Sequence, residues 1–411
     1  MKAPKAVSSN ILAGLLVFFG VGASWGDSDS QRLVQANNGF AFDLVRQIVR
    51  EQPTQNIFIS PFSVSIALQM LGNGAEGNTK SEIQSVLRTE SLPQDKLNAA
   101  SKRLNQFIKS QTALTLDSAN GIWYQNHFHL KPDFGAAARD FFGATPGPVD
   151  FESPKSADII NQWASKETRG KVSGIVSFPF PPATRVILVN AIYFKGKWDD
   201  PFDKHLTKPR DFYLANGSKK QTPMMSQHKE FRYQENGDFQ AVRLPYAGNN
   251  LAMYLFLPAK NSSPARLLDV LSEKNESKKM LRQFTDREGT VIFPKFKFDY
   301  DILLNQPLQD LGMPQAFSET TADFSAMADE PLFVNEVKQK SFVDVNEEGT
   351  EAAAVTELGL SSGIEMEPPK PFEMIIDRPF LFVIADDYIP IENDNPDQAI
   401  LFVGIVNEPM P

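Results

Sequence analysis

Cysteine is missing from the whole chain of 411 residues. Its absence excludes disulfide bonds, thiolate metal sites, a cysteine nucleophile and a thioester-linked lipid. The stability of the folded chain therefore has to come from packing alone. Histidine is scarce, with 4 residues, and the last of them is His228. His127 and His129 could share one face of a strand, as two zinc ligands do, but no third ligand is evident. We expect neither a metal nor another cofactor.

The scarcity of histidine also weighs against a hydrolase. Residues 359–363 match the G-x-S-x-G pattern that surrounds the nucleophile of many hydrolases, with Ser361 at its centre. That pattern requires a helix directly after the serine and a histidine later in the chain. Two adjacent prolines follow at 368–369, and no histidine follows at all. A secreted serine hydrolase is therefore a remote alternative, and no P-loop or dinucleotide motif suggests another enzyme.

Positive charge is in the minority, with 41 Lys and Arg against 50 Asp and Glu and a formal net charge of -9. An acidic chain without a dense Lys/Arg run is a poor partner for phosphate backbones, so we expect no nucleic-acid binding. No clear basic patch suggests a polyanion cofactor either.

Long apolar runs are missing, except one at residues 11–21. Lys2 and Lys5 precede this run and small residues follow it, which predicts an export signal over residues 1–26. The run is too short to span a bilayer comfortably, although an uncleaved membrane anchor is the alternative. We expect a secreted protein, extracellular or periplasmic, with no membrane contact after removal of the signal.

The remaining pattern predicts an α+β protein, because helical periodicity comes first and strand-like runs dominate later. Residues 27–38 are polar and are expected to be flexible, and no linker divides residues 39–411, which we assign to a single domain. Helices are predicted from Gly39 onward and over 62–72, 81–87, 97–109 and 156–168. Strands are predicted over 186–194, 241–246, 251–257, 289–298, 331–345, 379–385 and 399–406.

Residues 347–363 combine small side chains with bracketing glycines. Read with the period of a strand, Thr350, Ala352 and Ala354 fall on one side, which would be small and mostly apolar. Alanine and glutamate also favour a helix, and Gly349 supplies a flexible pivot. The segment is therefore either a bistable element or a mobile alanine-rich loop.

The sequence resembles the serpins, the serine protease inhibitors, along residues 36–411. The block "VDVNEEGTEAAA" (343–354) looks like the serpin hinge. Five further blocks resemble the family in the same order: 56–79, "INQWASKETRGKV" (160–172), "LVNAIYFKGKWDDPF" (188–202), "DRPFLFVI" (377–384) and "ILFVGIVNEP" (400–409). The resemblance implies about nine helices around three mainly antiparallel or mixed β-sheets, with an exposed reactive loop at about 347–371.

The resemblance also implies a suicide inhibitor that supplies no catalytic group. A serine protease would cut the loop as a substrate, and the freed hinge strand would insert into the central sheet and trap the acyl-enzyme. A cysteine protease is an alternative target, and a monomer is expected. A serpin-fold binding or carrier protein that does not inhibit is the alternative function.

By the same resemblance, the reactive bond would join Gly363 and Ile364, with Leu360 and Met366 as alternatives. No Arg or Lys lies between Thr350 and Pro369, so a trypsin-like target is not expected. Small and apolar residues suit elastase-, subtilisin- or chymotrypsin-like enzymes. The hinge would comprise Glu347, Gly349, Thr350, Glu351, Ala352, Ala353 and Ala354.

A polar cluster behind the central strands would control opening of the sheet. Ser60, Ser63 and Asn190 would belong to it, and Trp198 would lie where the sheet first opens. The family often has a histidine where this chain has Gln339. In a strand Gln339 shares a face with Val337, so it should be buried and hydrogen-bonded, and it does not titrate.

Overall fold

The computed structural model describes residues 28–110, 114–144, 146–248, 250–272, 280–281, 283–350, 370–386 and 398–410. The predicted export signal lies outside these ranges. So do Glu351, Ala352, Ala353 and Ala354 of the hinge, and the candidate reactive-bond residues Leu360, Gly363, Ile364 and Met366.

Eight α-helices lie within the described residues, and none of them is both long enough and apolar enough to cross a membrane. Two short 3₁₀ turns, η1 (Lys204–Leu206) and η2 (Gln315–Phe317), accompany them. The helices are α1 (Ser28–Glu51), α2 (Pro61–Gly72), α3 (Gly77–Val86), α4 (Gln94–Lys109), α5 (Pro132–Phe142), α6 (Lys155–Glu167), α7 (Pro264–Ser272) and α9 (Asn305–Asp310).

The first turns of α1 correct one expectation. Residues 28–38 are not a flexible polar segment but part of the helix, with Leu33, Val34 and Asn37 buried. These positions extend the stripe that continues with Phe40 and Leu44 at helical spacing. Burial of that stripe stabilises a helix that its polar composition did not suggest.

The strands form two hydrogen-bonded sheets. The nine-stranded sheet runs β1-β15-β14-β8-β7-β6-β9-β13 with β5 on β6, and the six-stranded sheet runs β10-β11-β4-β2-β3 with β12 on β4. The strands are β1 (Ile57–Ile59), β2 (Leu114–Gln125), β3 (Gly147–Val149), β4 (Val186–Lys197), β5 (Lys208–Tyr213), β6 (Lys219–Glu235), β7 (Phe239–Pro245), β8 (Leu251–Pro258), β9 (Thr285–Pro294), β10 (Phe296–Leu303), β11 (Val334–Val345), β12 (Gly349–Thr350), β13 (Phe372–Ile375), β14 (Phe380–Asp386) and β15 (Ile400–Val406).

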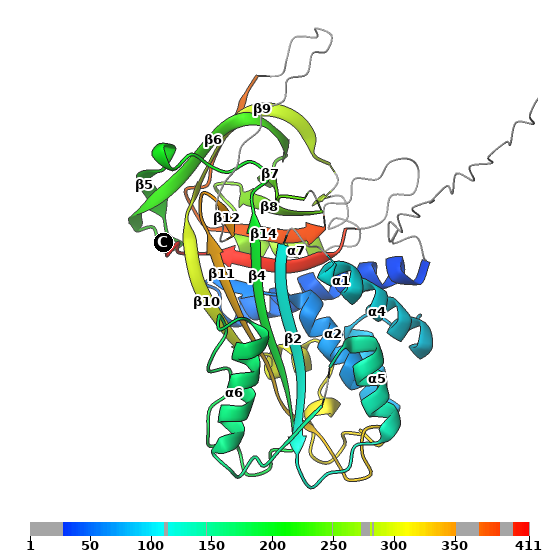
Figure 1. Cartoon of the computed structure of the whole chain (residues 1–411). Helices are drawn as coiled ribbons and strands as arrows, with labels where there is room; N and C mark the ends of the chain where they lie inside the picture. The colour runs from blue at the N-terminus through cyan, green and yellow to red at the C-terminus, as the bar shows by residue number, and fades with distance from the viewer. Residues whose placement is uncertain are drawn as a thin grey trace, which may run out of the picture.

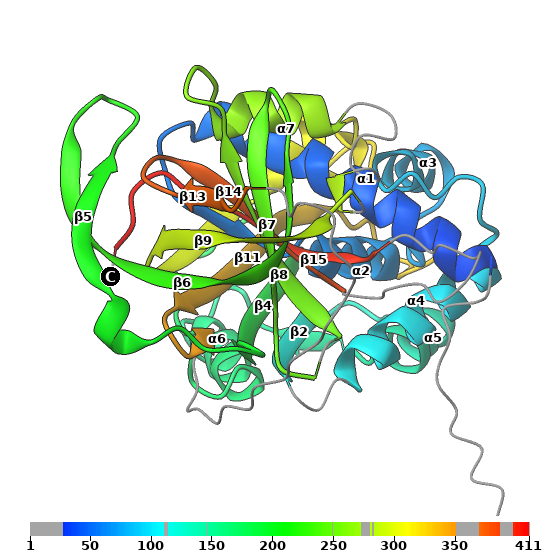
Figure 2. The same cartoon turned by 90° about the horizontal axis from the view of Figure 1, so that it is seen from above.

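The α+β class is confirmed. The three expected sheets appear as two hydrogen-bonded sheets, because β6 belongs to two groups of strands. This strand of 17 residues pairs with β5, β9 and β7 in turn, so it joins two groups of strands into one sheet. Figure 2 shows the β5–β6 end projecting from the body. The strand predicted over 289–298 is two strands, because the chain leaves the nine-stranded sheet after β9 and enters the other sheet as β10.

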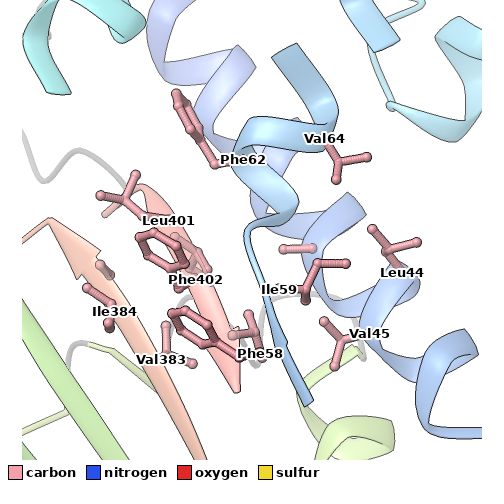
Figure 3. Packing of buried hydrophobic residues seen from close by; sticks show 14 of the residues in the cluster. Leu44, Val45, Phe58, Ile59, Phe62, Val64, Val383, Ile384, Leu401 and Phe402 are labelled. Atoms are coloured by element: carbon pink, nitrogen blue, oxygen red, sulfur yellow. The ribbon is translucent and has the colours of Figure 1, made fainter. Parts of the chain in front are cut away.

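The main core lies between the two sheets and beneath α1 and α2. Phe402 of β15 stacks on Phe58 of β1 at a ring-centroid distance of 5.0 Å and packs at 5.4 Å against Phe194 of β4. Figure 3 shows Phe58 next to Phe402 on the side of β15, and Ile59 on the other side of β1, facing the α1 residues Leu44 and Val45. A smaller apolar cluster joins α6 to the outer face of the six-stranded sheet, and Figure 1 shows α6 lying over that face. The long strands of this sheet are therefore covered on both faces.

Candidate functional site

The central feature of the six-stranded sheet is a parallel contact between β4 and β11, which we call the seam. Its register begins at Val334 opposite Val186 and ends at Phe342 opposite Tyr193. The outer neighbours of both strands, β10 and β2, are antiparallel to them. A new strand entering the seam could therefore run antiparallel to β4 and β11 at once.

The chain already begins such a strand beyond the last pair of the seam. After β11 ends at Val345, residues 346–349 form a turn, in which the Asn346 N–H donates to Gly349 O at 2.9 Å. The two residues of β12 then pair antiparallel with β4, Gly349 opposite Lys197 and Thr350 opposite Gly196. Figure 1 shows β12 beside β11 and β4 at this end of the sheet.

Gly349 is required by the geometry of this turn. Its φ is +134°, a region that side-chain-bearing residues rarely adopt, and a Cβ here would lie 2.3 Å from the carbonyl oxygen of Gly196. The next residue, Thr350, is buried, and its Oγ1 lies 3.1 Å from the hydroxyl oxygen of Tyr246. Burial raises the pKa of Tyr246 well above its usual range, so the phenol stays protonated and can donate.

Trp198 packs against the turn formed by residues 346–349. Its ring stacks on Tyr246 at a centroid distance of 4.8 Å, and its indole N–H donates to Asn346 O at 2.9 Å. Its backbone N–H donates to Glu348 O at 3.1 Å. Trp198 therefore holds the turn from which β12 starts.

Glu347 anchors the turn from the other side. Its carboxylate is 5% exposed and accepts from Lys295 Nζ at 2.8 Å and Thr207 Oγ1 at 2.7 Å. The Phe202 N–H donates to its carbonyl oxygen at 2.8 Å. Burial alone would raise the pKa of Glu347, but the hydrogen bonds from Lys295 and Thr207 bring it below its ordinary value. The charged form is therefore the one that stabilises the hinge.

A buried polar cluster bridges the seam on its inner face. Gln339 of β11 lies opposite Asn190 of β4, and its Nε2 donates to Asn190 Oδ1. Its Oε1 accepts from the Ser60 N–H at 2.8 Å, and its Nε2 also donates to Ser60 O at 3.1 Å. Gln339 is fully buried, as predicted, and its amide matches both donors and acceptors.

The same cluster continues into β2 and α2. Asn190 Nδ2 donates to Asn120 Oδ1 at 2.6 Å and to Ser63 Oγ at 2.5 Å. Ser63 Oγ lies 2.6 Å from Ser118 Oγ, and Ser60 Oγ caps α2 by accepting from the Ser63 N–H. Three strands, β11, β4 and β2, thus share one network with helix α2.

The structure brings together four of the five residues assigned to the opening cluster. Ser60, Ser63, Asn190 and Gln339 form one network, whereas Trp198 contacts the hinge instead. Sequence reasoning missed Asn120 and Ser118 because β2 was not predicted. It also missed Lys295, Thr207 and Tyr246, for which the local sequence gives no signal.

Across the described part of the chain, no group of three His, Asp or Glu side chains is arranged to hold a metal ion. His129 instead lies 3.3 Å from a carboxylate oxygen of Glu330. The candidate nucleophile Ser361 lies outside the described residues.

Comparison with known proteins supports the resemblance over almost the whole chain. A family model described as "Serpin (serine protease inhibitor)" matches residues 35–409. The chain is 34% identical to an uncharacterized serpin-like protein of Methanosarcina mazei, over 93% of this chain and 89% of that protein. It is 33% identical to leukocyte elastase inhibitor A of Rattus norvegicus, over 92% of this chain and 100% of that protein.

A solved structure shows the same fold. The crystal structure of native protease nexin-1 with heparin matches with a TM-score of 0.80 and 30% identity. The match covers 92% of this chain and 100% of that chain.

Proposed function

Since the chain belongs to the serpin family of serine protease inhibitors, we propose that it is secreted and traps a protease irreversibly. The protease cuts the reactive loop and becomes acylated, and the freed segment after Thr350 enters the seam before the acyl bond is hydrolysed. The protein is a substrate that captures its enzyme and contributes no catalytic group of its own.

One observation carries this proposal: β12 already occupies the entrance of the seam in an antiparallel register. If that register continues, each later residue pairs with one earlier residue of β4. Ala353 would then lie opposite Tyr193, and Thr356 opposite Asn190. Tyr193 faces outward and Asn190 faces the polar cluster, so a small side chain meets the aromatic ring and a hydroxyl meets the polar network.

For the target we propose an elastase-, subtilisin- or chymotrypsin-like protease, cutting between Gly363 and Ile364. The proposal is supported by the absence of Arg and Lys between Thr350 and Pro369, and by the relative named leukocyte elastase inhibitor A. An acidic specificity pocket would find no cation to pair with in this segment.

The experiment is to incubate the mature protein with one protease of each of these classes. We expect a covalent complex that survives SDS, with a mass equal to inhibitor plus protease minus a C-terminal fragment. Mass spectrometry of that fragment identifies the cut bond. Cleavage of the loop by a broad panel of proteases without any complex would contradict the proposal.

A second measurement tests insertion independently of trapping. Unfolding of the loop-cleaved protein should require a higher temperature than unfolding of the uncut protein, because the added strand completes the seam with two new ladders. The control is the wild-type protein incubated with a protease inactivated beforehand. An unchanged Tm after cleavage would contradict insertion.

A further inference from the structure

The outer face of the seam carries a second bridge, made of Tyr193, Phe342 and Lys171. We propose that this aromatic–cation bridge is the outer latch of the seam, which has to open at the start of insertion and so sets how long the uncut inhibitor stays active. This inference rests on the proposed function and names what regulates it.

The latch spans the two strands that have to part. Tyr193 of β4 and Phe342 of β11 are register partners, and their ring centroids lie 6.2 Å apart. Lys171 Nζ lies 5.6 Å from the centroid of Tyr193 and 5.7 Å from that of Phe342. Both distances are within the range at which an ammonium is attracted to an aromatic face. One cation therefore holds a ring on each side of the seam.

The latch and the polar cluster lie on opposite faces. Phe342 follows Gln339 by three residues on β11, and Tyr193 follows Asn190 by the same step on β4. An odd step along a strand reverses the direction of the side chain. The seam is thus bridged by amides on the inside and by rings and a cation on the outside.

The outer latch opens before the polar cluster, because it lies nearer to the end of the seam at which the new strand enters. The pair Phe342–Tyr193 is the last of the parallel register, next to the end where β12 docks. In the continued register the incoming Ala353 would pass between these two residues, on their face of the sheet. The polar cluster lies deeper along the seam, opposite Thr356.

Surrounding charges hold the latch in place. Lys297 of β10 lies 5.5 Å from the centroid of Phe342 and pairs with Asp344 at 3.3 Å. On the other side, Arg169 pairs at 2.8 Å with Asp117, the register partner of Tyr193 on β2. Lys171 follows α6 closely in the chain, so the latch also ties the segment after α6 to the seam.

Insertion of a strand separates the two halves of the latch. Neighbouring strands lie about 4.8 Å apart, so an inserted strand moves the backbones of Tyr193 and Phe342 to about twice that distance. The rings then lose contact with each other and with their shared cation. The latch stabilises only the uncut state.

The test compares Lys171→Met, which keeps an aliphatic stem without the charge, with Lys171→Arg, which keeps the cation. Lys166→Met is the matched control, since Lys166 is an exposed lysine in the last turn of α6. For each full-length mature protein, the rate of activity loss is measured just below the Tm, together with the Tm before and after cleavage of the loop.

We expect Lys171→Met to lose inhibitory activity about two- to five-fold faster than wild type, the factor that one cation–π contact is worth. Its Tm should fall in the uncut form and remain unchanged in the cleaved form. Lys171→Arg should retain the wild-type rate, and Lys166→Met should match wild type throughout.

Equal behaviour of Lys171→Met and Lys166→Met would overturn the latch, and so would an equal loss of Tm in the cut and uncut forms. Both outcomes leave the proposed function intact if wild type gains stability on cleavage and traps its protease. A wild-type protein that does neither contradicts the proposed function itself.

Discussion

Two regions of this molecule solve the problem of a buried strand differently. β14 lies between β8 and β15, antiparallel to both, and all 7 of its residues are buried. β11 and β4 are parallel, and a polar cluster bridges them where the seam is buried. The first region is thus paired on both edges and packed by apolar side chains. The second holds polar groups that an incoming strand could satisfy again.

The comparison teaches that two strands joined by apolar packing have no reason to separate. Two strands joined by hydrogen-bonded side chains can separate if a new strand offers those side chains other partners. We expect the apolar packing of β14 and β15 to be the same in the cut and uncut forms, because it depends on burial and needs no polar partner. At the seam, the amides of Gln339 and Asn190 need partners, but strand insertion can supply others. Changes in the first region should affect the cut and uncut forms alike, and changes in the second should not.

The largest expected loss of stability comes from a change in the first region, around β14 and β15. Phe402→Ala removes a fully buried ring that packs on Phe58 and Phe194 and should cost about 3–5 kcal/mol. Chemical denaturation of the cut and uncut proteins should give similar losses. A loss confined to the uncut form would break the distinction between the two regions.

Gly349→Ala tests the hinge. Strain at this φ costs about 1–3 kcal/mol, and the close approach to Gly196 O adds to it, so β12 should be displaced. On SDS gels we expect less covalent complex and more cleaved inhibitor. Gly217→Ala is the control, because Gly217 also has a positive φ but a Cβ there would meet nothing within 4 Å. Equal effects of both variants would remove the special role of the hinge glycine.

Gln339→His tests whether the inner bridge titrates. With glutamine, we expect no change in stability from this cluster near neutral pH. A buried neutral histidine would have a folded-state pKa below its unfolded value of about 6.5, so its stabilisation would be lost as the pH falls below that value, at up to about 1.4 kcal/mol per pH unit. Urea titrations between pH 5 and 8 measure this. An equal slope in wild type would contradict a non-titrating cluster.

The smallest expected effect is the loss of stability when acid protonates Glu347 and breaks its charge pair with Lys295. The folded-state pKa of Glu347 is lowered, so its contribution is present above the unfolded pKa near 4.5 and is lost as the pH falls through the folded value. Thermal unfolding of wild type and Glu347→Gln should converge below this range. A constant difference between them at all pH values would argue against the charge pair with Lys295.

The sequence predicted the elements whose apolar pattern is continuous. The central residues of α2, β4, β14 and β15 were predicted because they form nearly continuous apolar runs. The structure buries nearly all of them. β2 was missed, since its sequence includes Asp117, Asn120 and Gly121, which are unusual in strands. β5 and β6 were missed because charged residues cover their exposed sides.

The candidate site was predictable only where the local pattern implied burial. The alternation of side chains along β11 predicted that Gln339 is buried, and a buried amide needs hydrogen-bond partners. Which partners they find depends on contacts between distant segments. Glu347 with Thr207 and Gln339 with Ser60 are examples, and no local spacing encodes either pair.

The short strand β12 has a kinetic consequence. Adding a strand to a sheet resembles zippering: the first pairs are costly because they order the chain before other contacts reward it, and later pairs each extend an ordered end. Here the Gly349–Lys197 and Thr350–Gly196 pairs are formed in the uncut protein. In the proposed insertion, the chain therefore starts from pairs already formed on β4, and after the cut it propagates between β4 and β11 as the latch and the polar cluster open.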